Sequence, residues 1–436
     1  MRCLQSLSRI EIRFTIMKFS IIFHLSLLSL AQFALSEKQY RGCKVFTITS
    51  LANETQYNAV IDLQKVRGVD FWSEPSRKRY TDVMVYPDEQ NNVEQYLAEY
   101  GIDYKVAISD VQGAVDKGKD LRSTRQNSQE MNWKEYQRLS VIHSWLDALA
   151  AHNPNIAQIG SIGRTTEGRD MKTIKLSSNL RKNNPIIFID GGIHAREWIS
   201  PAVVTYIIGK LMSFEPEDRE IMANVDWVFL PVMNADGYEY THTEDRLWRK
   251  SRSIHNGNDC IGVDLNRNFD FHWGENGVKD DPCANTYHGP YPFSEPESNA
   301  TAKFMLANRN RIRAYITFHS YSQLMLTPYG YTEDLPDDYD QLEALGKRAI
   351  KALEEVHGTE YEVGAPSHIL YSNSGSSRDF AKGVPEIKYS FTIELRDQGD
   401  YKFILPPQQI IPTAEETWEA VRVIARQVVQ EASEEE

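Results

Sequence analysis

The 436-residue sequence has few cysteines, no excess of positive charge and, beyond its N-terminus, no long apolar run. Four cysteines in a chain of this length exclude a small domain that depends on a dense set of disulfides. The net charge of −13 argues against nucleic acid as a partner, because phosphate binding requires a basic face. A membrane-spanning helix requires about 20 apolar residues, and no later stretch provides them. With 41% hydrophobic and 25% charged residues, the composition is that of a globular protein.

The N-terminal segment has the pattern of a secretory signal peptide. Residues 17–18 are Met-Lys, residues 19–30 are almost wholly apolar, and small residues lead up to Glu37. This order predicts a leader over residues 1–36. Met17 is an alternative start, because the residues before it fit the pattern poorly. We therefore expect a secreted, extracellular protein without a membrane anchor.

Residues 43–108 alternate between strand and helix patterns in the order β-α-β-β-α-β, which predicts a small split-βαβ (ferredoxin-like) α+β domain. The expected strands are 44–49, 69–72, 83–86 and 104–108, and the expected helices are 54–66 and 88–100. This region contains no cluster of His, Cys or acidic residues at metal-ligand spacing. We interpret it as a structural or inhibitory module.

Between residues 109 and 132 the apolar periodicity weakens and basic residues lie among Ser, Gln and Asn. Such a solvated basic linker is accessible to proteases. A trypsin-like enzyme would cut after Arg122 or Arg125, which makes residues 37–125 a propeptide. The alternative is an uncut linker between two domains.

From Trp133 onward strands alternate with helices, which predicts a largely parallel sheet covered on both faces. Ser200-Pro201 is typical of an N-cap followed by proline at the first helical position. The expected strands are 157–162, 172–176, 186–189, 225–230, 313–318 and 389–393, and the expected helices are 133–151, 202–214, 295–308, 338–356 and 413–430.

Two His-x-x-Glu motifs occur, and they differ in their surroundings. His194 and Glu197 follow a short apolar strand and two glycines, where open α/β sheets place their active sites. His357 and Glu360 follow an amphipathic run and flank a glycine, which is typical of a helix end. An imidazole and a carboxylate at the first position can both bind one metal ion.

Two further polar residues are expected at the ends of buried strands. His319 follows the strand 313–318, and Glu394 follows the strand 389–393. A lone histidine at a strand end is commonly structural. Together with His194 and Glu197, however, His319 completes a two-His-one-carboxylate set, which leaves zinc an open fourth position, as catalytic sites require.

Six motifs are spread over about 200 residues of the chain: His194-Ala-Arg-Glu197, Arg246-Leu-Trp-Arg-Lys250, Gly262-Val-Asp-Leu-Asn-Arg-Asn268, His319-Ser-Tyr-Ser-Gln323, Ile369-Leu-Tyr371 and Thr392-Ile-Glu-Leu-Arg396. With these motifs, residues 126–436 resemble a secreted metallocarboxypeptidase of the pancreatic A/B type, and residues 37–125 resemble its activation segment. The resemblance implies a mixed, largely parallel eight-stranded sheet with helices on both faces, preceded by the activation domain. It also implies one zinc ion per chain.

The resemblance assigns a role to each residue of the active centre. His194, Glu197 and His319 would bind zinc. Glu394 would act as general base on the zinc-activated water, and Arg249 would polarise the scissile carbonyl and stabilise the oxyanion.

Other residues would bind the substrate. Asn266 and Arg267 would hold the terminal carboxylate, which a planar fork of donors suits, and Tyr371 would close as a lid. Asp264 would orient His194. Arg196, Tyr321 and Phe403 would line the outer subsites, and Cys260 and Cys283 would form the family disulfide.

The resemblance also implies partners and a location. Peptide and protein C-termini would be substrates, a trypsin-like protease would activate the zymogen, and the propeptide would inhibit it. The enzyme would be a monomer in the digestive lumen. Cys43 has no assigned partner, and Asn53 and Asn299 begin glycosylation motifs.

Seven residues after Tyr371, at the position that sets specificity in this family, the chain has Arg378. Members of the family commonly have an apolar residue or an aspartate at this position, so the arginine departs from both common patterns. A buried guanidinium needs an anionic partner, so Arg378 predicts removal of C-terminal Glu or Asp. In the alternative, Arg378 pairs with Asp379 and the pocket accepts apolar or aromatic ends. Two further readings are an inactive peptide-binding relative and an amino-group-directed zinc exopeptidase; the Asn-Arg pair and the single metal set disfavour the latter.

Overall fold

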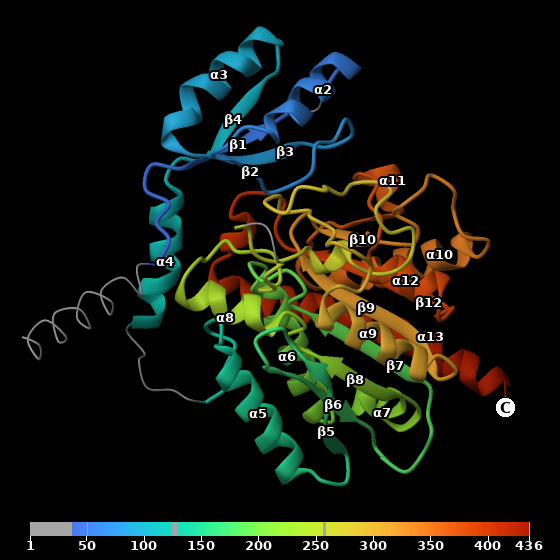
Figure 1. Ribbon diagram of the computed structural model, residues 1–436. Helices are drawn as coiled ribbons and strands as arrows, with labels where there is room; N and C mark the ends of the chain where they lie inside the picture. The colour runs from blue at the N-terminus through green and yellow to red at the C-terminus, as the bar shows by residue number, and fades with distance from the viewer. Residues whose placement is uncertain (1–36, 50, 124–129, 256–258, 436) are drawn as a thin grey trace, which may run out of the picture.

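The computed structural model describes residues 37–49, 51–123, 130–255 and 259–435, which form a small N-terminal unit above a larger one (Figure 1). The expected leader over 1–36 and the possible cleavage site at Arg125 lie outside these residues, as does the side chain of Arg122. Among the helices of the described ranges, none is long and apolar enough to cross a bilayer.

The small unit is a four-stranded antiparallel sheet with two helices, as the sequence predicts. Its strands lie in the order β2-β3-β1-β4. Side chains alternate along each strand. Phe46 and Val83 therefore pack against the helices, whereas Val45 and Met84 face the large unit. The elements are β1 (Lys44–Ile48), α2 (Glu54–Leu63), β2 (Val69–Phe71), β3 (Thr81–Val85), α3 (Gln90–Glu99) and β4 (Tyr104–Ile108).

The segment expected to be an irregular linker is helical over much of its length. Helix α4 spans Val111–Ser123. Val111 and Val115 lie four residues apart, and both are buried in one cluster with Ile404 of the large unit. This short apolar stripe stabilises the helix through packing on the large unit. Two apolar residues among many polar ones were too few to predict it from the sequence.

The large unit is built on an eight-stranded mixed sheet, in the order β11-β10-β12-β9-β7-β8-β6-β5, which confirms the predicted fold class. The strands are β5 (Ala157–Arg164), β6 (Asp170–Leu176), β7 (Ile186–Gly191), β8 (Asp226–Leu230), β9 (Ile312–Ser320), β10 (Leu324–Leu326), β11 (Glu362–Gly364) and β12 (Tyr389–Leu395). The central strands β12, β9, β7 and β8 are parallel to one another. Strands β10 and β11 were not predicted, because three residues are too few to establish a period.

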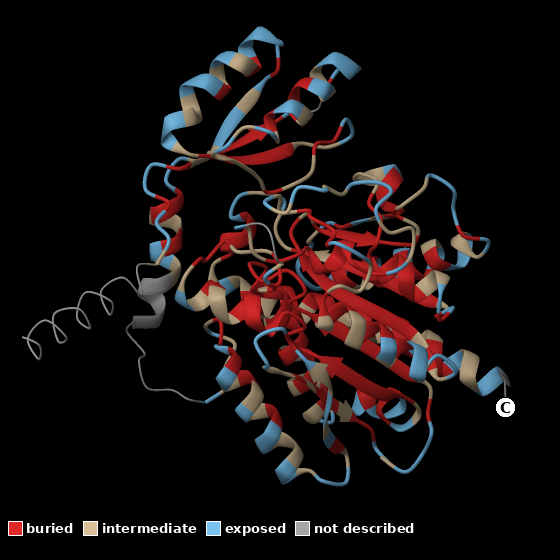
Figure 2. Cartoon of the chain, in the orientation of Figure 1, coloured by how far each residue is buried: buried red, intermediate tan, exposed pale blue. Residues whose placement is uncertain are grey.

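Helices cover both faces of this sheet, and the strands between them are buried (Figure 2). One core contains residues of α5, α6, α10 and α13, and the other contains residues of α9 and α12. The helices are α5 (Leu139–His152), α6 (Ile199–Met212), α7 (Arg219–Asn224), α8 (Ala235–Thr243), α9 (Pro296–Ala307), α10 (Tyr339–His357), α11 (Pro366–Ile369), α12 (Ser377–Gly383) and α13 (Ile410–Glu435).

The turn after β7 brings the first His-x-x-Glu motif to the sheet edge. Gly192 adopts φ +66°, a conformation that glycine tolerates best. Ser200 was expected to be the N-cap of the next helix, but that helix begins at Ile199, one residue earlier. Instead, the Ser200 hydroxyl accepts from the N–H of Gly192 (2.9 Å) and donates to the carbonyl of Phe318 (2.6 Å). It thereby ties the ends of β7 and β9 together.

Candidate active site

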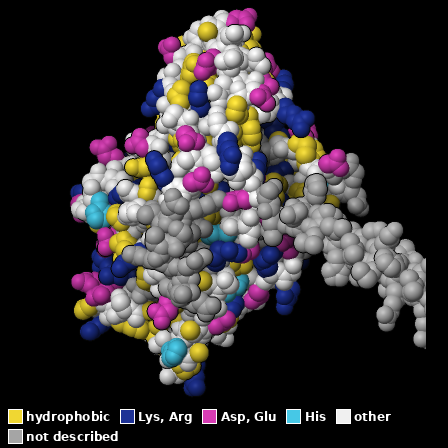
Figure 3. Space-filling model, turned by 90° about the vertical axis from the view of Figure 1, so that its left-hand side faces the viewer, with side chains coloured by type: hydrophobic (Ala, Val, Ile, Leu, Met, Phe, Trp, Pro, Cys, Tyr) yellow, Lys and Arg dark blue, Asp and Glu magenta, His cyan; other side chains and the backbone are white. Residues whose placement is uncertain are grey.

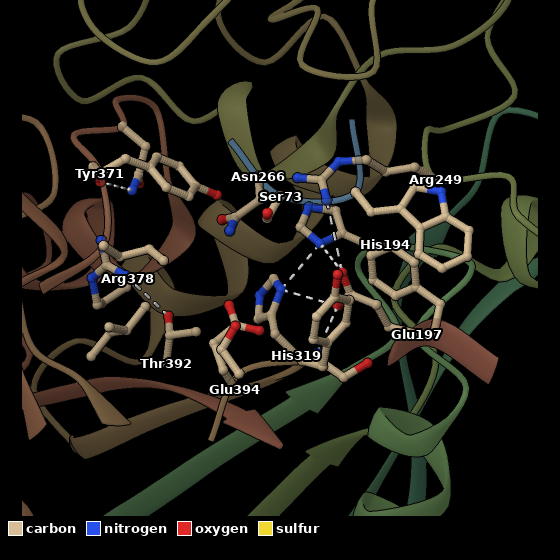
Figure 4. A pocket seen from close by; sticks show the side chains of 18 of the residues that line it. Ser73, His194, Glu197, Arg249, Asn266, His319, Tyr371, Arg378, Thr392 and Glu394 are labelled. Atoms are coloured by element: carbon tan, nitrogen blue, oxygen red, sulfur yellow. Dashed lines mark hydrogen bonds and ion pairs between the residues drawn. The ribbon is translucent and has the colours of Figure 1, made fainter. Parts of the chain in front are cut away.

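A cavity of about 60 Å³ lies at the carboxyl ends of the parallel strands, and the small unit closes it from above. Most of the residues predicted for the active site line it (Figure 4). Its lining comprises Trp72 and Ser73 of the small unit and His194, Glu197, Arg249, Asn266, Arg267, His319, Ser320, Tyr321, Ser322, Leu326, Leu370, Tyr371, Asn373, Arg378, Thr392, Glu394 and Phe403 of the large unit. The fold therefore gathers residues that are 200 positions apart in the sequence.

His194, Glu197 and His319 form a buried cluster in which one ligand atom of each lies within 4.8 Å of the others. The two Nδ1 atoms are 3.1 Å apart. The Glu197 carboxylate lies 2.8 Å from Nδ1 of His194 and 3.2 Å from Nδ1 of His319. The three side chains converge on one point, as Figure 4 shows.

The chemistry of this cluster fits a divalent cation. Nε2 of His194 faces the carboxylate of Asp264 at 3.1 Å, so it carries the proton and Nδ1 presents a lone pair. That lone pair faces the carboxylate oxygen of Glu197, which is also an acceptor. Burial lowers the pKa of His319 to about 4, which favours the neutral, ligating form of this imidazole. A cation between the three groups removes the repulsion, and two imidazoles with one carboxylate are a typical zinc set.

Asp264 connects the metal cluster to Arg249. Besides facing His194, it accepts from Nε (3.1 Å) and Nη2 (2.8 Å) of Arg249. Burial acts to raise the pKa of Asp264, but Arg249 and His194 hold it well below its usual value. Nη1 of Arg249 also lies 3.8 Å from Glu197. Asp264 therefore fixes the orientations of an imidazole and a guanidinium that face one cavity.

Glu394 is positioned by the register of the sheet. Strands β12 and β9 run parallel, and Glu394 pairs with His319 across them. Both side chains line the same cavity. Burial, together with the charge of Glu197, raises the pKa of Glu394 well above its usual value, and a cation between the three cluster residues would counteract that effect. A carboxylate here can exchange a proton with a molecule in the cavity.

Asn266 and Arg267 lie in a 3-10 turn (Leu265–Arg267) beneath the cavity. Oδ1 of Asn266 accepts from the N–H of Ser377, and Nε of Arg267 donates to the carbonyl of Gly277. Gly375 adopts φ +67°, and a Cβ there would lie only 2.4 Å from the carbonyl oxygen of Arg267. Glycine is thus required for the loop after Tyr371 to pack onto this turn.

Arg378 lies at the far end of the cavity from the metal cluster (Figure 4). Arg378 lines the cavity and is also paired with Asp379. Its Nε donates to Asp379 (3.0 Å), whose other oxygen accepts from the N–H of Gly330 (2.7 Å). Its Nη1 lies 3.3 Å from the hydroxyl of Thr392, and its buried Nη2 has no hydrogen-bond partner, although it lies 3.0 Å from Asp379.

The cavity also contains residues without a predicted role in the site, among them Thr392. Gly330, which contacts Arg378 from outside the lining, likewise had no predicted role. A Cβ at Gly330 would lie 2.6 Å from Nη2 of Arg378, so glycine makes room for the guanidinium. No local pattern signals this role, because the contact joins segments 48 residues apart.

The predicted outer subsites lie beneath the small unit. Arg196 is 3.6 Å from Asp70 and stacks over the ring of Phe403 at 4.1 Å. The Tyr321 hydroxyl donates to Asp82. The rings of Tyr321 and Phe403 are 5.0 Å apart. These residues therefore lie together, with two carboxylates of the small unit against them.

The cysteines within the described residues and the second His-x-x-Glu motif lie outside the cavity. Cys260 and Cys283 form a disulfide, as the resemblance implied. Cys43 is free and buried between the two units, and burial raises its pKa to about 11. His357 lies at the end of α10 and pairs with Glu415, as expected for a solvated helix end.

Comparisons with known proteins agree with this geometry. Residues 142–420 match the family model described as zinc carboxypeptidase, and residues 49–118 match that of the carboxypeptidase activation peptide. The chain is 49% identical to carboxypeptidase B of Astacus astacus, covering 68% of this chain and 97% of that protein. It is 40% identical to carboxypeptidase B of Rattus norvegicus over 93% and 98% of the two chains. Among solved structures, carboxypeptidase A from Helicoverpa armigera aligns with a TM-score of 0.84 at 30% identity, covering 91% of this chain and all of that one.

Proposed function

This chain belongs to the zinc carboxypeptidase family, as a metallocarboxypeptidase zymogen of the A/B type, and we propose that it removes acidic residues, glutamate above all, from peptide C-termini. The observation that carries the acidic preference is the Arg378 guanidinium in the cavity that also holds the metal cluster. The cofactor of the family is one zinc ion per chain, and His194, Glu197 and His319 are the residues that would hold it.

The residues around the metal cluster divide the work of hydrolysis. Bound zinc supplies a Lewis acid that lowers the pKa of water and polarises a carbonyl. Glu394 accepts the proton of the attacking water and passes it to the leaving amine. Arg249, held by Asp264, donates to the oxygen of the scissile carbonyl as negative charge develops there.

A second group of residues restricts the enzyme to chain ends. Arg267 and Asn266 bind the terminal carboxylate, because a fork of N–H donors matches its two oxygens. Tyr371 closes over the bound residue, with its ring already extended into the cavity (Figure 4). A peptide bond in the middle of a chain provides no carboxylate for Arg267.

Arg378 supports an acidic side chain in the pocket. Asp379 pairs with the guanidinium through Nε and Nη2, whereas Nη1 contacts the uncharged hydroxyl of Thr392. The guanidinium is buried, so a substrate carboxylate beside Nη1 can add a second ion pair and recover part of the free energy of its desolvation. The same guanidinium repels a C-terminal Lys or Arg.

The Arg378–Asp379 pair favours a second candidate, an enzyme that removes apolar or aromatic residues. In that case the pair is already neutral, and Leu326 and Leu370 supply an apolar wall. The relatives bear both names, carboxypeptidase A and carboxypeptidase B, so the preference is argued from the pocket itself.

The test compares kcat/KM for peptides that differ only in a C-terminal Glu, Phe or Lys, after trypsin activation. We expect Glu to exceed Phe by about tenfold or more, with Lys slowest, because a buried charge pair contributes about 2–5 kcal/mol. Arg378→Ile should lower the rate for Glu on the order of 100-fold and raise it for Phe. Arg378→Lys is the matched control, which keeps the charge and part of the preference.

Faster release of Phe than Glu by the unmodified enzyme, with little effect of Arg378→Ile, would support the apolar alternative. An inactive peptide-binding relative is tested in the same assay, since such a protein releases no free amino acid from any peptide. We expect release that a zinc chelator abolishes and added zinc restores.

We also propose the processing of the chain. Residues 1–36 form the leader of a secreted protein, residues 37–125 form the propeptide, and residues 126–436 form the enzyme. The family matches support the order of propeptide and enzyme. Cleavage after Arg122 or Arg125 releases the enzyme from the propeptide. N-terminal sequencing of the enzyme after limited trypsin treatment identifies which of the two bonds is cut.

A further inference from the structure

The inward face of the small unit places two carboxylates on two cations of the large unit. Asp82 of β3 lies 2.7 Å from Nζ of Lys402, and Asp70 of β2 lies 3.6 Å from Arg196. Charged side chains of both signs are interspersed over the outer surface seen in Figure 3, whereas Asp82 and Lys402 are both buried. The pair is therefore an internal contact between the units, shielded from solvent.

Lys402 occupies an unusual place in the backbone. Its φ is +56°, in the left-handed region that favours glycine, and its side chain is almost fully buried. Asp397 holds the loop by accepting from the backbone N–H of Lys402 (3.0 Å) and of Tyr401 (2.6 Å). A long cationic residue in this conformation carries a backbone cost, and a structural role in the loop alone would be served better by glycine.

The Lys402 ammonium shares one carboxylate with a residue of the cavity. The Asp82 oxygen next to Nζ also accepts from the Tyr321 hydroxyl at 2.6 Å. Within the described ranges, Asp82 is the one carboxylate at ion-pair distance from Lys402. Burial acts to lower the pKa of Lys402, which Asp82 partly offsets. Removal of the small unit therefore takes away the ion-pair partner of Lys402 and leaves Asp397 of its own loop, which is not at ion-pair distance, as the remaining carboxylate that acts on it.

This cation lies next to the site where a peptide would enter. Tyr321 lies next to Lys402 in space, and Phe403 follows it in the sequence. Both line the same cavity as His319. The residue before Tyr321, Ser320, donates its backbone N–H to Glu197 at 3.2 Å. The Asp82 carboxylate is thus bound by Tyr321, which lies two residues after His319 of the metal cluster.

We propose that in the activated enzyme Lys402, together with Arg196, forms a cationic subsite that binds an acidic side chain on the amino side of the scissile bond. In the zymogen Asp82 occupies this subsite, with its carboxylate at the place of the substrate's. The inference rests on the proposed carboxypeptidase activity and adds a second determinant to it. The preferred substrate is a peptide with an acidic residue upstream of the one that is removed.

The experiment uses trypsin-activated enzyme and pairs of peptides that share their C-terminal residue. Each pair differs by Glu against Gln at one of the three preceding positions. We expect kcat/KM to favour Glu about 5- to 20-fold at one position, in the range of a partly exposed charge pair. Lys402→Met should bring that ratio close to 1, and Lys402→Arg should preserve most of it.

Lys388→Met is the matched control, because Lys388 pairs with Glu431 on α13 and should leave the ratio unchanged. High salt should reduce the ratio in the unmodified enzyme, since exposed charges are screened. A ratio near 1 in the unmodified enzyme overturns the proposal. The proposal is also overturned if Lys402→Met keeps the ratio and only raises the activity of the uncleaved zymogen. In that case Lys402 serves only to bind the propeptide.

The outcome is independent of which residue the enzyme removes. If Phe proves a better C-terminal residue than Glu, the pairs are made with Phe and the upstream ratio is measured in the same way. If no peptide is cleaved at all, the proposed activity fails and the subsite fails with it.

Discussion

The two His-x-x-Glu segments have the same residue types at the same spacing, yet they lie in opposite environments. His194 and Glu197 are buried, with exposures of 4% and 3%, and face a second histidine. His357 is partly exposed at a helix end, and its partner is Glu415 rather than Glu360. The backbone carbonyl of Glu360, rather than its carboxylate, accepts a hydrogen bond from Gln323.

The difference teaches that the motif acquires its chemistry from the strand before it. The turn after β7 places His194 where β9 delivers His319, so that a third ligand is available. Helix α10 ends at His357, and its C-cap Gly358 adopts a φ of +73°, which stops the helix there. Spacing alone supplies two ligands, and only the sheet supplies the rest.

The largest effect is expected from removing a ligand in one motif and the matching residue in the other. Glu197→Gln should abolish stable zinc binding and lower kcat/KM by about 1,000-fold or more, because the metal lowers the activation free energy by several kcal/mol. Glu360→Gln should leave both unchanged. Zinc per chain and peptide hydrolysis, measured side by side, test the contrast. Equal loss in both variants would contradict it.

Next in size is Glu394→Gln, which separates catalysis from metal binding. We expect zinc content to remain at one per chain while kcat falls about 10²- to 10⁴-fold, as for loss of a general base. Single-turnover rates with metal analysis on the same sample provide the measurement. Loss of zinc from this variant would instead make Glu394 part of the metal site.

A smaller effect is expected from Asp264→Asn, because Asp264 acts through His194 and Arg249. Loss of such a hydrogen-bonded neighbour weakens metal affinity about 10- to 100-fold. Competition with a chelator of known affinity measures the change in Kd for zinc. An affinity equal to that of the unmodified enzyme would show that His194 needs no partner.

The smallest effect is expected from His357→Ala in the second motif. Its pair with Glu415 is partly exposed on both sides, so the free energy of unfolding should change by less than about 1 kcal/mol. Denaturant unfolding of the variant and the unmodified zymogen provides the measurement. A larger loss, or any loss of zinc, would place His357 in a role that its surroundings do not explain.

The spacing of apolar residues predicted most helices and strands, because a buried strand or an amphipathic helix has an apolar pattern that is visible in its own local sequence. The strand before His194 was predicted at 186–189 and extends over Ile186–Gly191. Helix α4 was missed, since its apolar stripe packs partly on another unit. The short strands β10 and β11 were missed because hydrogen bonding to neighbouring strands, rather than a local pattern, makes them strands.

The sequence by itself determined the residue types of the metal cluster, the strand ends that bear them and the unusual Arg378. These are local properties, since a strand or a turn is encoded within a few residues. The tertiary structure decided which polar groups meet: Asp264 with both His194 and Arg249, Gly330 beneath Arg378, and Asp82 on Lys402. Such contacts join segments up to several hundred residues apart, and they depend on packing that no short window of sequence contains.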